Sequence, residues 1–115
     1  MKKLKNNYLE FSLDDNVLRV LIKGDIDHHS AKRVRESIDA QIMSKKPLVV
    51  ILELNHVEFM DSSGLGLILG RYTVASEIGA SLVLSRPSRR IRKILELAGI
   101  ERIMKIEGDG DNEAS

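Results

Sequence analysis

The chain has 115 residues, a length that suits one domain, and its 43% hydrophobic and 30% charged residues exclude the intrinsically disordered and collagen-like classes. It has no cysteine, which excludes disulfide bonds, thiolate metal sites and a cysteine nucleophile. A net charge of +1 and an aromatic content of 3% argue against a nucleic acid partner and a base-stacking surface.

The start of the chain and its apolar runs bear on its location. The basic first residues are followed by polar residues in place of the apolar stretch of a secretory signal. Apolar runs such as residues 48–52 are far shorter than the ~20 residues that span a bilayer. We therefore expect a soluble cytoplasmic protein that binds neither membranes nor nucleic acid.

The N-terminal part predicts a hairpin followed by a helix. Strand-like residues 8–13 and 17–22 flank three turn-forming residues, Asp-Asp-Asn. The next stretch, residues 24–27, breaks the strand pattern, and Asp27 is expected to cap a helix that ends near Lys46. The helix is amphipathic because four apolar residues recur at helical spacing. They are Ala31, Val34, Ile38 and Ile42.

The middle of the chain predicts a central strand and a second helix. Residues 48–54 are almost all apolar, as in a strand covered on both faces by helices. Residues 55–61 are expected to form a loop. A helix then begins at Ser62 or Ser63 and ends at residue 78, where the next residue is a glycine that tolerates a left-handed conformation.

The C-terminal part predicts a strand at 80–85, a helix from 87 or 88 to 98, and a last strand at 102–106. The acidic tail, 107–115, has little to bury and is expected to be disordered. Strands that alternate with helices indicate an α/β fold. We expect one domain over 1–106 with a mixed, mostly parallel sheet of about five strands and helices packed against it.

The junction between the central strand and the second helix is the most informative segment. A helix N-terminus carries unpaired N–H groups and favours anions, so Ser63 lies in a positive local potential. One interpretation is that Ser63 has a functional role at this helix N-terminus. The other is that Asp61, Ser62 and Ser63 only cap the helix, because these residue types are preferred caps. The residue types alone leave both open.

The second helix has two faces that differ in character. An apolar stripe of Leu65, Ile68, Leu69 and Tyr72 is expected to pack on the sheet. Another strip contains Gly66, Gly70, Thr73 and Glu77. Each interior glycine costs roughly 0.5 to 1 kcal/mol relative to alanine, so two at this spacing indicate that another backbone comes close. That backbone belongs either to a partner or to a neighbouring helix of the same domain.

Three stretches together resemble a known family. They are FMDSSGLG at residues 59–66, GDIDHHSA at 24–31 and ILGRY at 68–72. The first resembles the signature of STAS domains, in particular those of anti-sigma factor antagonists of the sporulation type, and the other two agree with it. The similarity runs from about residue 17 to residue 106. It implies a STAS fold and a regulatory protein that is not an enzyme and needs no cofactor or metal.

The resemblance also implies a partner switch. The unphosphorylated chain, a monomer when free, would bind an ADP-bound anti-sigma factor that is also a serine kinase (SpoIIAB-like) and so release a sporulation sigma factor. The kinase would phosphorylate Ser63, and a serine phosphatase (SpoIIE-like) would reverse the modification. Ten residues are expected to touch the partner. They are Asp25, Asp27, His28, Asp61, Ser62, Ser63, Gly64, Leu65, Gly66 and Gly70.

Two alternatives within the family stay open: a stress-response regulator with a different kinase, and a nucleotide-binding STAS module. A metal at His28 and His29 is disfavoured because adjacent side chains on a helix diverge. A hydrolase triad of Ser63, Asp61 and His56 is disfavoured because the pattern G-x-S-x-G is absent.

The third helix has a basic start, although the helix dipole disfavours cations there. The basic residues are Arg86, Arg89, Arg90, Arg92 and Lys93. A solvated face is the simpler interpretation. An acidic partner surface or a nucleic acid backbone is the alternative.

Overall fold

The computed structural model describes residues 7–110 of the chain. In chain order the elements are β1 (Asn7–Asp14), β2 (Val17–Ile26), α1 (Ala31–Lys45), β3 (Val49–Met60), α2 (Ser62–Glu77), β4 (Ser81–Ser85), α3 (Arg89–Leu97), a 3-10 helix η1 (Ile100–Arg102) and β5 (Lys105–Glu107). The sheet has the order β1-β2-β3-β4-β5, in which β1 is antiparallel to β2 and the other neighbours are parallel. The predicted α/β fold with five strands is confirmed.

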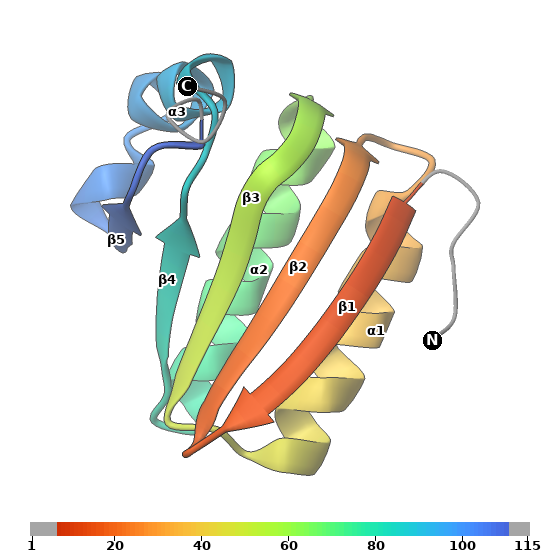
Figure 1. Ribbon diagram of the computed structural model, residues 1–115, viewed down its shortest axis with the longest axis vertical. Coiled ribbons are helices and arrows are strands. Elements are labelled where there is room, and N and C mark those ends of the chain that lie inside the picture. Colours follow the sequence, from red (N-terminus) through yellow and green to blue (C-terminus); the bar gives the residue numbers. More distant parts are fainter. Residues whose placement is uncertain (1–6, 111–115) are drawn as a thin grey trace.

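The helices are not distributed evenly over the sheet. Figure 1 shows α1 and α2 side by side behind the strands, and α3 beyond the end of β4. Successive residues of a strand point to opposite faces, and the helix-facing positions of β3 are fully buried. They are Val50, Leu52 and Leu54. The prediction that this strand is covered by helices on both faces is wrong, because α1 and α2 cover the same face.

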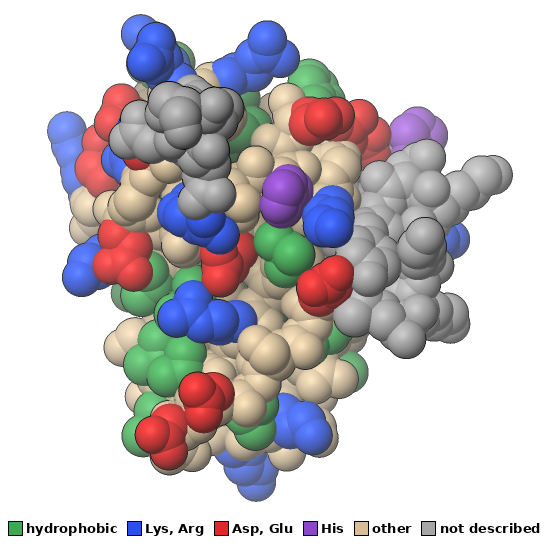
Figure 2. Space-filling view, viewed as in Figure 1, with side chains coloured by type: hydrophobic (Ala, Val, Ile, Leu, Met, Phe, Trp, Pro, Cys, Tyr) green, Lys and Arg blue, Asp and Glu red, His purple; other side chains and the backbone are tan. Residues whose placement is uncertain are grey.

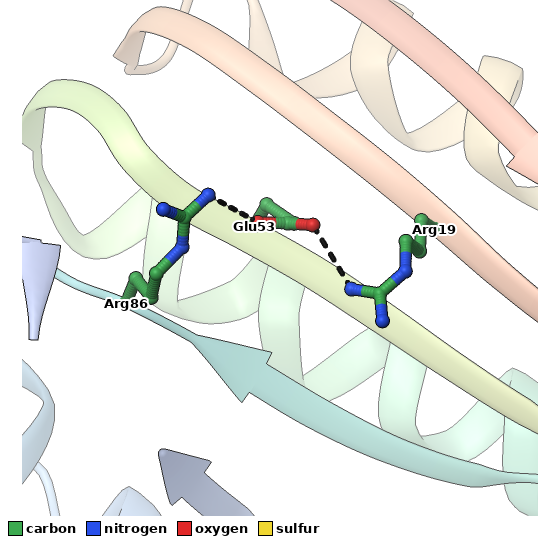
Figure 3. A network of polar contacts seen from close by, with 3 residues as sticks. All are labelled: Arg19, Glu53 and Arg86. Atoms are coloured by element: carbon green, nitrogen blue, oxygen red, sulfur yellow. Dashed lines mark hydrogen bonds and ion pairs between the residues drawn. The ribbon is translucent and has the colours of Figure 1, made fainter. Parts of the chain in front are cut away.

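The face of the sheet away from α1 and α2 is polar. Glu53 lies between two arginines, with its carboxylate 3.1 Å from Nη1 of Arg19 and 2.8 Å from Nη2 of Arg86 (Figure 3). Burial raises the pKa of Glu53, but the hydrogen bonds from Arg86 and Arg19 outweigh it, and the net pKa is lowered. Charged side chains of both signs are scattered over this face (Figure 2). It therefore presents neither a basic nor an acidic surface.

Strands β2 and β3 continue well past the ends that the sequence predicts. The two strands still pair at their far ends, where Asp25 lies opposite Phe59 and Ile26 opposite Met60. The sequence predicts that the strand breaks at Gly24. In the structure Gly24 has φ 93° and lies between two irregularities of register, and the pairing of β2 with β3 continues beyond it. The expected loop over 55–61 is mostly strand. Both strands thus end at one edge of the sheet, where α1 and α2 begin (Figure 1).

The start of α1 differs from the prediction. The helix begins at Ala31 and not directly after Asp27. The Asp27 carboxylate accepts hydrogen bonds from the backbone N–H groups of His29 (2.9 Å) and Ser30 (3.1 Å). Its carbonyl oxygen accepts from the N–H of Ala31 at 2.9 Å. Asp27 therefore holds the turn that leads into the helix, without capping the helix itself.

The buried face of α2 is also rotated from the predicted stripe. Leu69 is 38% exposed, while Leu67 and Arg71 are buried. The Arg71 Nε lies 2.8 Å from Oδ1 of Asp39 on α1, and only 5% of the Arg71 side chain is exposed. Burial lowers the pKa of Arg71, and the Asp39 carboxylate opposes that effect. An ion pair between the two helices therefore occupies a buried position that lies outside the predicted apolar stripe.

The C-terminal strand begins later than predicted, because Arg102 ends the 3-10 helix and β5 starts at Lys105. The following residues lie against the β4–α3 connection. The N–H of Gly110 donates to the carbonyl oxygen of Pro87 at 3.0 Å, and the N–H of Arg86 donates to that of Glu107 at 2.7 Å. The rest of the tail that we expect to be disordered, 111–115, lies outside the described residues.

Replacing Asp39 with alanine is expected to lower the free energy of unfolding by about 1 to 3 kcal/mol, because the buried Arg71 charge loses its partner. The double variant Asp39→Ala/Arg71→Met should recover most of the loss, since no buried charge is left. Urea unfolding at neutral pH measures both. A single variant as stable as the wild type would contradict the role of the pair.

Glu53→Gln is expected to cost about 1 kcal/mol at neutral pH, where the carboxylate is ionised between its two arginines. The folded-state pKa is lowered, so this contribution is complete above the ordinary value of 4.5 and is lost as pH falls through the folded value. Urea unfolding from pH 7 to pH 2.5 should show that the free energies of unfolding of the wild type and of Glu53→Gln converge at acid pH. A difference that does not depend on pH would contradict the network.

Candidate functional site

The first turn of α2 is held against the end of β2 by Asp61. The Asp61 N–H donates to the Ile26 carbonyl oxygen at 3.3 Å. Its carboxylate accepts from the N–H of Ser63 at 2.8 Å and is the cap of the helix. Ser63 is half-buried, and within residues 7–110 its hydroxyl makes no hydrogen bond. Asp61 thus does the capping, and the Ser63 hydroxyl is left for other chemistry.

Gly64 allows α2 to approach the strands closely. It is buried, and a Cβ at this position would collide with Cγ of Met60 and lie 3.2 Å from the carbonyl oxygen of Ile26. Any side chain here would push the first turn of α2 away from the ends of β2 and β3. Gly64 therefore positions Ser63 and offers no surface of its own.

Gly66 and Gly70 behave differently from Gly64. A Cβ at either position would have no atom within 4 Å, apart from its own chain neighbours and the helix backbone. The interpretation that these glycines allow close packing inside the domain is therefore wrong for the described residues. Gly66 is exposed and Gly70 half-buried, so the glycine strip is open to an approaching molecule.

The turn between β2 and α1 brings further expected residues to the same edge. Asp25 and Asp27 are half-buried, while His28 and His29 are exposed. The two imidazole rings meet edge to face with centroids 5.6 Å apart. Hydrogen bonds from the backbone N–H groups of Ser30 and His29 lower the pKa of Asp27. No cluster of three or more potential metal ligands occurs within residues 7–110.

A groove of about 410 Å³ runs between the starts of α1 and α2. Its lining combines expected site residues with two cations that lie outside the predicted apolar stripe of α1, Lys32 and Arg35. The lining residues are His28, Ala31, Lys32, Arg35, Ser63, Gly66 and Leu67. The spacing i, i+3 of the two cations could have indicated one shared helix face. Only the packing of α1 beside α2 shows that this face points at Ser63.

The sequence pattern of the STAS domain matches residues 8–111, nearly the whole chain. The chain belongs to the STAS domain family. The resemblance that the three motifs indicate is thereby confirmed. No helix in the described part of this STAS domain is long and apolar enough to cross a membrane.

Relatives of this STAS domain include antagonists from two regulatory systems. An anti-sigma F factor antagonist of Paenibacillus polymyxa is 34% identical, and the match covers 96% of this chain and 92% of the relative. An anti-sigma-B factor antagonist of Bacillus subtilis (strain 168) is 28% identical, with 92% and 95% covered. The structure of the anti-sigma factor antagonist SpoIIAA in its unphosphorylated form superposes with a TM-score of 0.74, at 25% identity, covering 90% of this chain and 91% of that one.

A hydrolase triad is not assembled in this STAS domain. His56 lines a groove on the polar face of the sheet together with Arg19, Glu53 and Arg86. Ser63 lines the groove between α1 and α2, which lie behind the sheet (Figure 1). The imidazole therefore faces a different part of the surface from the hydroxyl that it would have to activate.

The basic start of α3 is partly balanced by backbone groups. Ser88 caps the helix by accepting from the N–H of Ile91 at 3.2 Å. Nη2 of Arg92 donates to the Gly108 carbonyl oxygen at 2.5 Å, so the chain beyond β5 offsets one of the cations. Arg89, Arg90 and Lys93 line a broad groove of about 750 Å³ next to β3, while Arg86 pairs with Glu53. This groove is separate from the one that Ser63 lines.

Gly64→Ala is expected to lower the free energy of unfolding by about 1 to 3 kcal/mol, because the new methyl group overpacks the contact with Met60 and Ile26. Gly66→Ala is the matched control and should raise stability by roughly 0.5 to 1 kcal/mol, since alanine favours the helix and meets no atom. Thermal unfolding of the two variants measures the difference. Equal effects of the two substitutions would contradict the distinction between a packing glycine and an open one.

Proposed function

We propose that this STAS domain is an anti-sigma factor antagonist that binds its partner through the edge around Ser63 and is switched off by phosphorylation of that serine. The observation that carries the proposal is the Ser63 hydroxyl, which makes no hydrogen bond within the described residues and heads a helix capped by Asp61. The names of the Paenibacillus and Bacillus relatives support the assignment. The protein acts in the cytoplasm and is a monomer when free.

The partner docks on the surface formed by the first turns of α1 and α2. Gly66 and Gly70 let the partner's backbone approach, because no atom of residues 7–110 outside α2 fills the space beside them. Phe59, 47% exposed at the end of β3, adds apolar area. Polar contacts come from the β2–α1 turn and from the start of α2. The residues that we assign to them are Asp25, Asp27, His28, Asp61 and Ser62, and Leu65 adds an apolar contact.

The partner is an anti-sigma factor with serine kinase activity that binds the domain together with ADP. In the modification step the Ser63 oxygen attacks the γ-phosphorus of ATP. The bond from that phosphorus to the β–γ bridging oxygen breaks, ADP leaves, and the hydroxyl proton passes to a base of the kinase. A serine phosphatase restores the hydroxyl with water. The domain itself contributes no catalytic group.

Phosphorylation opposes binding without unfolding the domain. It adds about −1.5 to −2 charges at neutral pH. In the free domain the N-terminus of α2 favours this charge and Asp61 opposes it. In a complex that buries Ser63, removing the dianion from water costs several kcal/mol, and about 3 kcal/mol weakens binding roughly a hundredfold. Release of the partner is the output.

The sigma factor released by this switch is of the sporulation type. The anti-sigma F factor antagonist of Paenibacillus is 34% identical, compared with 28% for the anti-sigma-B factor antagonist of Bacillus, at similar coverage. A stress-response sigma factor is the alternative, because both relatives share the fold. Competition with each of the two anti-sigma factors distinguishes the pathways.

Ser63→Ala is expected to bind the anti-sigma factor in the presence of ADP like the wild type and to resist modification. Ser63→Asp is expected to bind roughly a hundredfold more weakly, because a carboxylate is buried at the interface. Its thermal midpoint should stay within about 2 °C of the wild type, since the substitution is near the positive end of a helix. Titration calorimetry and thermal unfolding give the two readouts. Equal affinities of the two variants would refute the switch.

Incubation with the anti-sigma factor and ATP, followed by mass spectrometry, locates the phosphate. We expect it on Ser63 and not on the adjacent exposed Ser62. Ser62→Ala serves as the control: it removes one of the assigned contacts with the partner, and the phosphate should still be found on Ser63. Modification at any other residue would overturn the assignment of Ser63.

A further inference from the structure

The charged side chains that line the groove between α1 and α2 are all basic. Three of its residues carry or can carry positive charge, namely His28, Lys32 and Arg35. Ser63 contributes a hydroxyl group to the lining. Among the lining residues that the structure describes, none has a carboxylate side chain. Such a surface has the composition of an anion-binding site, because ammonium and guanidinium groups donate charge-assisted hydrogen bonds to phosphate oxygens.

The positive charge in this region is not balanced within the described residues. Neither Lys32 nor Arg35 has an ion-pair partner there. The nearby carboxylate of Asp39 is already paired with Arg71 at 2.8 Å. Burial is the main cause of the lowered pKa of Arg71, and the charge of Arg35 lowers it further. The cations between the two helices therefore repel one another, and an added anion would relieve the repulsion.

The carboxylates at the same edge are engaged elsewhere. Asp61 accepts from the N–H of Ser63, and Asp27 accepts from the N–H groups of His29 and Ser30. Neither lines the groove. Lys32 and Arg35 are three residues apart on α1 and thus share one face of that helix. Both are exposed, with long side chains that can follow an anion placed between the helices.

We propose that this groove is the receiving site for the phosphoryl group of phosphorylated Ser63, bound in cis by Lys32 and Arg35. The inference rests on the proposed function only for the identity of the modified serine. The phosphate then occupies the same groove that borders the glycine strip. Modification therefore changes the shape and charge of the docking surface while the domain stays folded.

The test uses full-length chain in which phosphoserine is incorporated at position 63 during translation, without any kinase. A ³¹P NMR titration measures the second pKa of the phosphate, ordinarily about 6. We expect it to be lowered by about half a unit or more, because two cations favour the dianion. Lys32→Ala/Arg35→Ala should return it towards the ordinary value, and high salt should weaken the effect.

Two matched controls sharpen the measurement. Arg33→Ala removes an exposed cation from the same turn of α1 that does not line the groove, so it should leave the phosphate pKa unchanged. Phosphoserine at the exposed neighbour Ser62 shares the N-terminus of α2 but does not line the groove, so its second pKa should be higher than that of phosphoserine at 63 and should not respond to Lys32→Ala/Arg35→Ala. Thermal unfolding of each variant verifies that the domain is folded.

The proposal is overturned if phosphoserine at 63 and at 62 titrate alike, or if Arg33→Ala has the same effect as the double variant. Because the phosphate is introduced without a kinase, this outcome is independent of the partner. If an anti-sigma factor kinase does not modify Ser63, the proposed function is contradicted, whereas the result of the phosphate titration stays valid. The two failures are thus distinguishable.

Discussion

The site depends on one steric constraint, the close approach of the first turn of α2 to the ends of β2 and β3. Gly64 permits it, because any Cβ there would meet Met60 and the carbonyl oxygen of Ile26. The Asp61 N–H donates a hydrogen bond to that same carbonyl oxygen, and the Asp61 carboxylate accepts one from the Ser63 N–H. The serine is thereby fixed to the paired ends of β2 and β3. Its hydroxyl stays available because its neighbour does the capping.

The two helices that form the groove, α1 and α2, are held together by an ion pair as well as by apolar packing. The contact between Arg71 and Asp39 joins α2 to α1 about two turns beyond Ser63. A buried charge pair tolerates fewer alternative arrangements than apolar side chains do, since each charge needs its partner nearby. The width of the groove and the position of its cations follow from that pairing. The Arg71–Asp39 contact therefore contributes both to the packing of the domain and to the position of the groove.

Local signals in the sequence were sufficient for most elements, whereas the role of Ser63 was predicted from the resemblance to the STAS family. The cap Asp61 and the terminal Gly79 lie next to the ends that they specify, so α2 could be bounded without its surroundings. The continuation of β2 through Gly24 depends on pairing with β3, which local composition does not contain. The burial of Arg71 depends in the same way on Asp39, 32 positions earlier in the chain (71 − 39). The cationic groove was missed because its two walls come from different helices.

The open space beside Gly66 and Gly70 separates recognition from folding. Substitutions on this strip meet no neighbour inside the domain, so the sequence there is free to drift without endangering the core. A duplicated copy of the gene could acquire a new binding preference through this strip alone, while Gly64 stays invariant. Paralogous antagonists in one cell could in this way stay insulated from one another and still share an identical scaffold.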